Sequence, residues 1–321
     1  MTTIKEALAE GATRLGDRDP QNKRRAARVL LAHSLNATQE HILSRPGDPI
    51  TETQYAAFLE LISRRVHGEP LQHITGHQEF YGLDFIVNAE VLIPRPETEF
   101  LVEQVLKLGT FPRLGSEEES RLLPEPEPGP DRQVPSPLID DRLIVDVGTG
   151  SGCIAIALAV SLPSAAIIAI DISSPALDVA RRNAERHGVT DRIQFLHGDL
   201  LGPLQQGRFE GSVDIIASNP PYVSTSRPDL VQREVRDFEP AIALYGGPDG
   251  LSFYRRLLVE AARFLKPDGH LVCEIGYSQL DDVLRLADAA GWDFANLAED
   301  LQGIPRTLTV RRKEAYGYRA D

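Results

Sequence analysis

The feature that most constrains the fold is the alternation of short apolar runs with helical patterns after Arg142. Strands are expected at 143–147, 166–170, 193–196, 213–217 and 270–275, with two closing strands near 294–297 and 307–310. Helices are expected between them, at 152–162, 175–187, 252–264 and 280–290. Strands joined by helices run parallel to one another. The pattern therefore predicts an α/β fold with a doubly wound, mostly parallel, Rossmann-like sheet, with ligands outside the carboxyl ends of the strands.

The segments before Arg142 differ in character. Residues 1–69 predict a small helical bundle, with apolar residues at helical spacing and Thr51 as the N-cap of the third helix. Within 70–108 we expect a β-hairpin, with strands at 80–87 and 91–93 around a turn at 88–90, followed by a helix from about Glu97 to Leu108. Residues 109–140 are rich in proline and glutamate, which predicts a flexible insertion without chemistry. The catalytic domain is expected at 141–321.

Composition narrows the classes of partner. The chain carries 34 basic and 47 acidic residues, a net charge of −13, which disfavours nucleic acid as a direct partner. Cys153 and Cys273 lie in apolar segments and are expected to be buried thiols, and the histidines have no ligand-like spacing, so no metal site is expected. No secretory signal or membrane-spanning run is evident. We expect a cytoplasmic protein without a membrane partner and, although the sequence does not determine the oligomeric state, a monomer.

A glycine loop joins the first expected strand to its helix. Its residues are Gly148, Thr149, Gly150, Ser151 and Gly152, and Asp146 lies just before it in the strand. Alternate glycines let main-chain N–H groups approach a ligand, and Asp171, after the second strand, can accept hydrogen bonds from ribose hydroxyls. Asp199 and Leu200, after the third strand, are expected beside an adenine ring.

These features also fit a dinucleotide-binding dehydrogenase. However, the loop reads Gly-x-Gly-x-Gly and not Gly-x-Gly-x-x-Gly, so its third glycine is misplaced for a pyrophosphate. Asp146 suits a cofactor that carries an amino-acid end and no phosphate. The loop therefore favours S-adenosylmethionine, with S-adenosylhomocysteine as the product.

The motif Asn219-Pro220-Pro221-Tyr222 follows the fourth strand. The prolines lack N–H donors and leave carbonyl groups free to accept. The Asn219 side-chain oxygen and the Pro220 carbonyl can accept the two hydrogens of a planar –NH2 group, while Tyr222 stacks on its plane. Such an arrangement orients a poorly nucleophilic amide nitrogen toward a sulfonium methyl group. We predict Asn219, Pro220 and Tyr222 to be catalytic, all four residues to bind the substrate, and Asn219 also to border the cofactor.

Further segments carry a resemblance to a known family. They include Pro70 to Gly76, Phe80-Tyr81-Gly82, 91–99 with its Arg95-Pro96-Glu97-Thr98-Glu99 run, Glu239-Pro240, 246–251, Glu274-Ile275-Gly276 and 300–303. Together with the two motifs above, they resemble the HemK/PrmC family of protein-glutamine N5-methyltransferases. The resemblance covers nearly the whole chain apart from the proline-rich insertion, which is longer than is expected for the family.

The resemblance implies a substrate-binding N-terminal domain and a cofactor held by Gly148 to Gly152 and Asp171. It also implies that the methyl acceptor, held by Asn219 to Tyr222, is the glutamine of the Gly-Gly-Gln motif in class 1 peptide release factors, the proteins that terminate translation. Arg95, Pro96 and Glu97 are implied to lie near the cofactor, while Glu97 and Thr98 could instead cap the next helix.

Three alternatives stay open. The first is a glutamine methyltransferase of a large-subunit ribosomal protein, against which the Arg95 to Glu99 run and residues 76–82 weigh. The second is a nucleic-acid amino (N6-adenine) methyltransferase, against which the charge weighs. The third is a non-catalytic cofactor-binding module, which would not need an intact Asn219 to Tyr222 motif.

Overall fold

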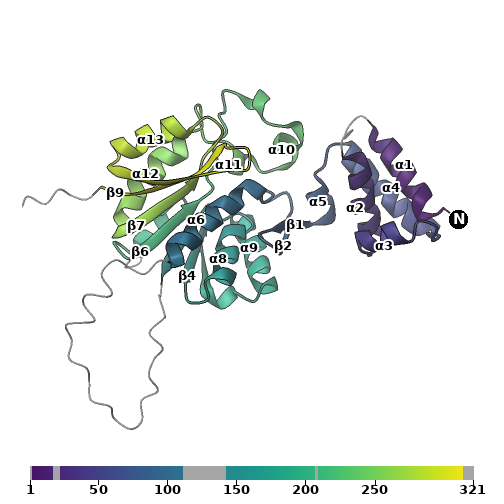
Figure 1. Cartoon of the computed structure of the whole chain (residues 1–321), viewed down its shortest axis with the longest axis horizontal. Helices are drawn as coiled ribbons and strands as arrows, with labels where there is room; N and C mark the ends of the chain where they lie inside the picture. Colours follow the sequence, from purple (N-terminus) through teal and green to yellow (C-terminus); the bar gives the residue numbers. More distant parts are fainter. Residues whose placement is uncertain (1, 17–21, 111–141, 207–208, 314–321) are drawn as a thin grey trace, which may run out of the picture. The chain divides into compact units, whose positions relative to one another are not determined.

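The computed structural model describes residues 2–16, 22–110, 142–206 and 209–313 (Figure 1). Contacts divide the chain into two compact units. Unit 1 comprises Met1–Glu79, Asp84–Ile93 and Arg227–Leu244, and unit 2 comprises Phe80–Leu83, Pro94–Ser226 and Tyr245–Asp321. Among the described residues, no helix is long and apolar enough to cross a membrane.

Unit 1 is built mainly from helices. They are α1 (Ile4–Leu15), α2 (Lys23–Ser34), α3 (Gln39–Ser44), α4 (Glu52–Val66), α5 (Leu71–Thr75), η5 (Pro228–Leu230), α10 (Arg233–Phe238) and α11 (Ala241–Leu244). The first five form a bundle around one apolar core. The predicted N-cap is confirmed, because the Thr51 hydroxyl accepts a hydrogen bond from the Gln54 amide at 3.2 Å. The side chains of Leu30, Phe58 and Ile62 lie in the core of this bundle.

The β-hairpin exists, but its predicted register is wrong. The strands are β1 (His77–Phe80) and β2 (Leu83–Ile86), so the turn falls inside the expected strand 80–87, and 91–93 is not a strand. Tyr81 and Gly82 both have positive φ, 52° and 72°, as the type I′ form of a two-residue hairpin turn requires. The β-forming aromatic residues Phe80 and Tyr81 masked this turn in the sequence.

Unit 2 contains a seven-stranded sheet, which confirms the predicted fold class. The strands are β3 (Leu143–Val147), β4 (Ala166–Asp171), β5 (Ile193–His197), β6 (Val213–Ser218), β7 (Leu265–Glu274), β8 (Trp292–Glu299) and β9 (Pro305–Arg312). Their order is β5-β4-β3-β6-β7-β9-β8, in which β3 to β7 are parallel and β9 is antiparallel to both of its neighbours. The reversal between β3 and β6 produces the edge at which such folds bind ligands.

Helices cover the two faces of this sheet (Figure 1). They are α6 (Glu99–Thr110), α8 (Cys153–Ser161) and α9 (Ser174–Arg186) on one face, and α12 (Ser252–Phe264) and α13 (Leu280–Ala289) on the other; the short η2 (Pro96–Thr98), η3 (Thr190–Arg192) and η4 (Gly202–Gln206) complete the unit. Alternate strand residues such as Val145, Ile170 and Ile216 pack with α12 and α13 in the larger core. Cys153 and Cys273 are buried free thiols, as expected.

The helix after the hairpin, α6, extends into the predicted insertion. Helix α6 continues to Thr110, so it includes the first two residues of the expected insertion, 109 and 110. The rest of the predicted flexible insertion, 111–140, lies outside the described residues.

Candidate active site

The carboxyl ends of four neighbouring strands bring the predicted site residues to one edge of the sheet. In spatial order β5, β4, β3 and β6, these strands lead into Asp199, Asp171, the glycine loop and Asn219. Hydrogen bonds tie the strand ends together: Gly198 N–H donates to the Asp171 carbonyl at 2.9 Å, and the Ser218 hydroxyl donates to the Val147 carbonyl at 2.8 Å. The predicted residues, scattered over 75 positions, therefore line one continuous edge.

The glycine loop is fixed against β4. The amides of Gly148 and Thr149 both donate to the Ile170 carbonyl, at 2.8 and 3.0 Å. Gly148 and Gly150 have positive φ, 74° and 55°, and a Cβ added at either would meet nothing within 4 Å, so their backbones border open space. Gly152 differs, because its Cβ would lie 2.9 Å from Ile156 and 3.1 Å from Ala180. The first two glycines can receive a ligand, whereas the third permits close packing.

Asp171 links the glycine loop to the end of β4. Its carboxylate accepts the Gly150 amide at 2.8 Å through Oδ2 and the Ser173 amide at 2.8 Å through Oδ1. Burial raises the pKa of this carboxyl, against the opposing effect of the amide donors. Because each oxygen of a carboxylate can accept more than one hydrogen bond, the group retains capacity for ribose hydroxyls.

Buried polar atoms at the loop test whether it fits S-adenosylmethionine. Asp146 is fully buried; its Oδ2 accepts the Thr149 hydroxyl at 2.6 Å and the Ala155 amide at 3.2 Å. Among the described residues, nothing bonds to Asp146 Oδ1 or to the buried Ser151 hydroxyl. Burial raises the pKa of Asp146 to about 7, a cost that a nearby ammonium group would offset. The donor set thus fits a cofactor with an amino-acid end.

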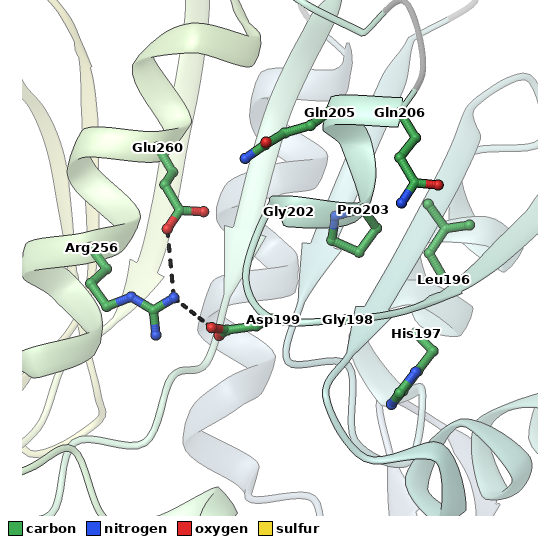
Figure 2. A pocket seen from close by; sticks show the side chains of 10 residues that line it. All are labelled: Leu196, His197, Gly198, Asp199, Gly202, Pro203, Gln205, Gln206, Arg256 and Glu260. Carbon is green, nitrogen blue, oxygen red and sulfur yellow. Dashed lines mark hydrogen bonds and ion pairs between the residues drawn. The ribbon is translucent and has the colours of Figure 1, made fainter.

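The side chain of Asp199 faces a pocket beyond β5. Its carboxylate bonds to Arg256 at 2.6 Å, and Arg256 also reaches Glu260 at 3.7 Å (Figure 2). This pocket, about 520 Å³ in volume, is lined by neither the glycine loop nor residues 219–222. The adjacent Leu200 has a φ of 48° and is buried in the core. Arg256 therefore bonds to Oδ2 of Asp199 and not to Oδ1. The contact of Asp199 with adenine stays a prediction.

The Asn219 to Tyr222 motif follows β6, and the side chain of its asparagine is held by a residue far from it in the sequence. The Asn219 side-chain Nδ2 donates to the hydroxyl of Thr98 at 3.0 Å. This bond leaves the side-chain oxygen Oδ1 available to accept. Pro220 and Pro221 are buried, and Asn219 is half-buried. The asparagine therefore has the orientation that acceptance of an –NH2 hydrogen requires.

Tyr222 is held at both its main chain and its hydroxyl. Its carbonyl accepts Gln279 Nε2 at 3.0 Å, and its hydroxyl donates to Glu274 Oε1 at 3.2 Å. A Cβ at Gly250 would lie 2.3 Å from the Tyr222 carbonyl, and one at Gly276 would lie 2.9 Å from its ring. Only glycine fits at these two positions. The ring is thus fixed by close packing and hydrogen bonds together.

Sequence reasoning missed the roles of Thr98, Glu274 and Gln279. Capping of the next helix by Glu97 and Thr98 was one of two open alternatives. The Thr98 hydroxyl instead donates to Glu274 Oε2 at 2.6 Å and accepts from Asn219 Nδ2. All three lie in or beside segments that carried the family resemblance, which was the available signal. No local pattern, however, indicates that they meet at Asn219 and Tyr222.

Comparison with protein families identifies two matching regions. Residues 6–76 match the PrmC N-terminal domain family, and residues 140–301 match a methyltransferase domain family. The second match contains the glycine loop and the Asn219 to Tyr222 motif.

Similar proteins span nearly the full chain. A release factor glutamine methyltransferase of Koribacter versatilis is 40% identical over 310 residues, covering 97% of this chain and 99% of that protein. One of Nitratidesulfovibrio vulgaris is 38% identical, with 97% and 95% covered. A bifunctional methyltransferase of Rickettsia bellii is 36% identical, but this chain spans only 54% of it.

Among solved structures, the hMettl16 catalytic domain in complex with MAT2A 3′UTR hairpin 6 is similar in fold. The TM-score is 0.50 at 16% identity, covering 78% of this chain and 81% of that one. At this identity the likeness concerns the fold alone.

Proposed function

Since this chain belongs to the release factor glutamine methyltransferase family, we propose that it methylates the glutamine side chain of the Gly-Gly-Gln motif in class 1 peptide release factors. The methyl group goes from S-adenosylmethionine to the amide nitrogen N5. The observation that carries this proposal is the orientation of Asn219, whose Nδ2 is bonded to Thr98 so that Oδ1 can accept from an amide –NH2 group.

In this proposal, the cofactor is held by the glycine loop and its neighbours. Gly148 and Gly150 present main chain to it, Asp171 accepts from its ribose, and Asp146 Oδ1 and the Ser151 hydroxyl face its amino-acid end. Asp199 and Leu200 border its adenine. When bound, S-adenosylmethionine supplies an electrophilic methyl group on a positively charged sulfur and leaves as S-adenosylhomocysteine.

The chain's own residues would prepare the acceptor amide. Asn219 Oδ1 and the Pro220 carbonyl accept its two hydrogens, and the Tyr222 ring covers its plane, with Pro221 shaping the wall. An amide nitrogen is a poor nucleophile because its lone pair is delocalised into the carbonyl group. Fixing both hydrogens directs the nitrogen toward the methyl carbon and stabilises the charge that develops on it. A nitrogen–carbon bond would form as the bond between the methyl carbon and the cofactor sulfur breaks, and the nitrogen would then release one amide proton.

The proposed substrate also bears on the compartment and the partners of the chain. We propose that the chain acts in the cytoplasm, as a monomer, with a protein partner and no direct nucleic-acid contact. The net charge of −13 supports a protein partner over a phosphate backbone.

The proposal predicts the acceptor residue. In an assay with methyl-labelled S-adenosylmethionine, purified release factor should become labelled, and a variant with Gly-Gly-Ala in place of Gly-Gly-Gln should not. Label on both proteins would contradict the glutamine assignment. Label on neither, from protein that still binds the cofactor, would contradict the release factor and point first to a large-subunit ribosomal protein and then to nucleic acid.

A further inference from the structure

The Asn219 side chain can face the acceptor in two ways, and only one of them is productive. With Oδ1 toward the site, it accepts a hydrogen from the acceptor –NH2. If the amide were rotated by half a turn, its own NH2 would oppose the acceptor NH2, and neither group could accept from the other. The direction of this amide therefore decides whether the motif functions, and the motif itself does not determine it.

The Thr98 hydroxyl selects the productive direction. It has one hydrogen, and that hydrogen points to Glu274 Oε2 at 2.6 Å. With its hydrogen committed, the Thr98 oxygen can only accept from Asn219, which it does from Nδ2 at 3.0 Å. Thr98 is 2% exposed, so water cannot readily replace this arrangement.

Glu274 sets the polarity of the whole chain of hydrogen bonds. Its side chain is also 2% exposed, and its two oxygens accept from Thr98 and, at 3.2 Å, from the Tyr222 hydroxyl. An ionised carboxylate can only accept, so both hydroxyl groups must point toward it. Burying a carboxylate costs free energy that a neutral side chain would avoid, so stability alone does not account for an acid here.

We propose that Thr98 and Glu274 are positioning residues for methyl transfer. The carboxylate of Glu274 orients the Thr98 hydroxyl, and Thr98 in turn holds the Asn219 amide with its oxygen toward the acceptor. Through its second oxygen, Glu274 also fixes the Tyr222 ring. This inference rests on the proposed role of Asn219 as the amide acceptor, and it assigns the orientation of the motif to residues 121 and 52 positions away from it.

Thr98→Val tests the proposal, because valine keeps the shape of threonine and removes its hydroxyl. We expect kcat to fall about 10- to 100-fold, as orientation of the acceptor is lost. The dissociation constant for S-adenosylhomocysteine, measured by calorimetry, should stay within about threefold of wild type, because the glycine loop is untouched. Thr98→Ser restores the hydroxyl and should recover most of the lost turnover.

Thr309→Val is the matched control. Thr309 is a buried threonine of β9 whose hydroxyl has no partner among the described residues, so it undergoes the same chemical change away from the motif. Its kcat should equal that of wild type. Equal turnover of Thr98→Val and Thr309→Val, or failure of Thr98→Ser to recover activity, would overturn the positioning role. Absence of label from wild type would instead reject the proposed substrate, so the two failures are distinguishable.

Glu274 should also determine how turnover depends on pH. Burial, mainly, raises its pKa to about 7, with Glu97 acting in the same direction and the Thr98 and Tyr222 hydroxyls and Arg306 opposing it. Groups on the other surrounding elements, Cys153 on α8 and Tyr254 on α12, are neutral, because burial holds the pKa of each well above neutrality. Above pH 7 the carboxylate accepts from both hydroxyl groups. Below it, the protonated acid becomes a donor on one oxygen, and one of the two bonds must reverse.

We therefore expect wild-type kcat, measured at saturating cofactor, to fall as the pH drops through about 7. Glu274→Gln cannot ionise, so its lower kcat should lose this acid limb. Saturation matters because Asp146, whose pKa is also raised to about 7, affects cofactor binding. An acid limb of the same midpoint in Glu274→Gln and wild type would overturn the assignment to Glu274.

Discussion

Replacing Asn219 with alanine is expected to lower kcat by about 10²- to 10³-fold, the loss typical of removing one oriented group from an active site. The variant loses Oδ1, which accepts an acceptor hydrogen, and the Nδ2 that bonds to Thr98 at 3.0 Å. The methyl-acceptor nitrogen would then rotate away from the line of attack. The measurement is single-turnover transfer of labelled methyl to release factor at saturating cofactor.

Cofactor affinity separates this effect from general damage. The glycine loop and Asp171 are held by bonds that do not involve Asn219, so affinity for S-adenosylhomocysteine should change by less than about threefold. Asn296→Ala is a suitable control, because the Asn296 side-chain amide also donates to another side chain, that of Gln104, and because Asn296 lies in β8, outside the Asn219 to Tyr222 motif. It should retain wild-type turnover. If Asn219→Ala does so too, the chain is a binding module or uses another acceptor-holding group.

Replacing Asp171 with alanine should have the opposite signature. Its carboxylate accepts the Gly150 and Ser173 amides, both at 2.8 Å, and is the proposed partner of the ribose hydroxyls. Hydrogen bonds to charged groups contribute about 1.5–3 kcal/mol each, so losing two ribose bonds should weaken cofactor binding by about 100-fold or more. At saturating cofactor, kcat should stay within about threefold of wild type, since the acceptor side is intact.

Calorimetric titration of S-adenosylhomocysteine measures this difference directly. Asp178→Ala provides the matched control, because Asp178 lies on the exposed side of α9 and pairs with Arg181 at 2.9 Å. Its affinity should equal that of wild type. Equal affinity in Asp171→Ala would refute the ribose assignment and leave Asp171 as a group that only supports the glycine loop.

Local sequence patterns predicted the bounds of those helices and strands that depend only on residues within the element. Helix α12 has the predicted bounds of 252–264, and β3 has those of 143–147, because apolar periodicity and flanking glycines act within one element. The hairpin shows where such patterns stop. Its turn at Tyr81 and Gly82 depends on two positive φ angles. The tyrosine is held in this conformation in part by a hydrogen bond of 2.9 Å from its backbone N–H to Glu99 Oε1. A β-forming sequence concealed it.

The sequence by itself determined the order of strands and helices, and with it the edge where the glycine loop, Asp171 and the Asn219 to Tyr222 motif meet. That follows because parallel strands joined by helices bring their carboxyl ends to one edge. Only the tertiary structure decided which residues hold the Asn219 and Tyr222 side chains in place. Thr98 and Glu274 are 176 positions apart, and their 2.6 Å hydrogen bond joins the end of η2 to the end of β7. Because the contact is buried, water does not compete with it and its hydrogen-bond direction stays fixed. Burial is a property of the folded chain that no single segment encodes.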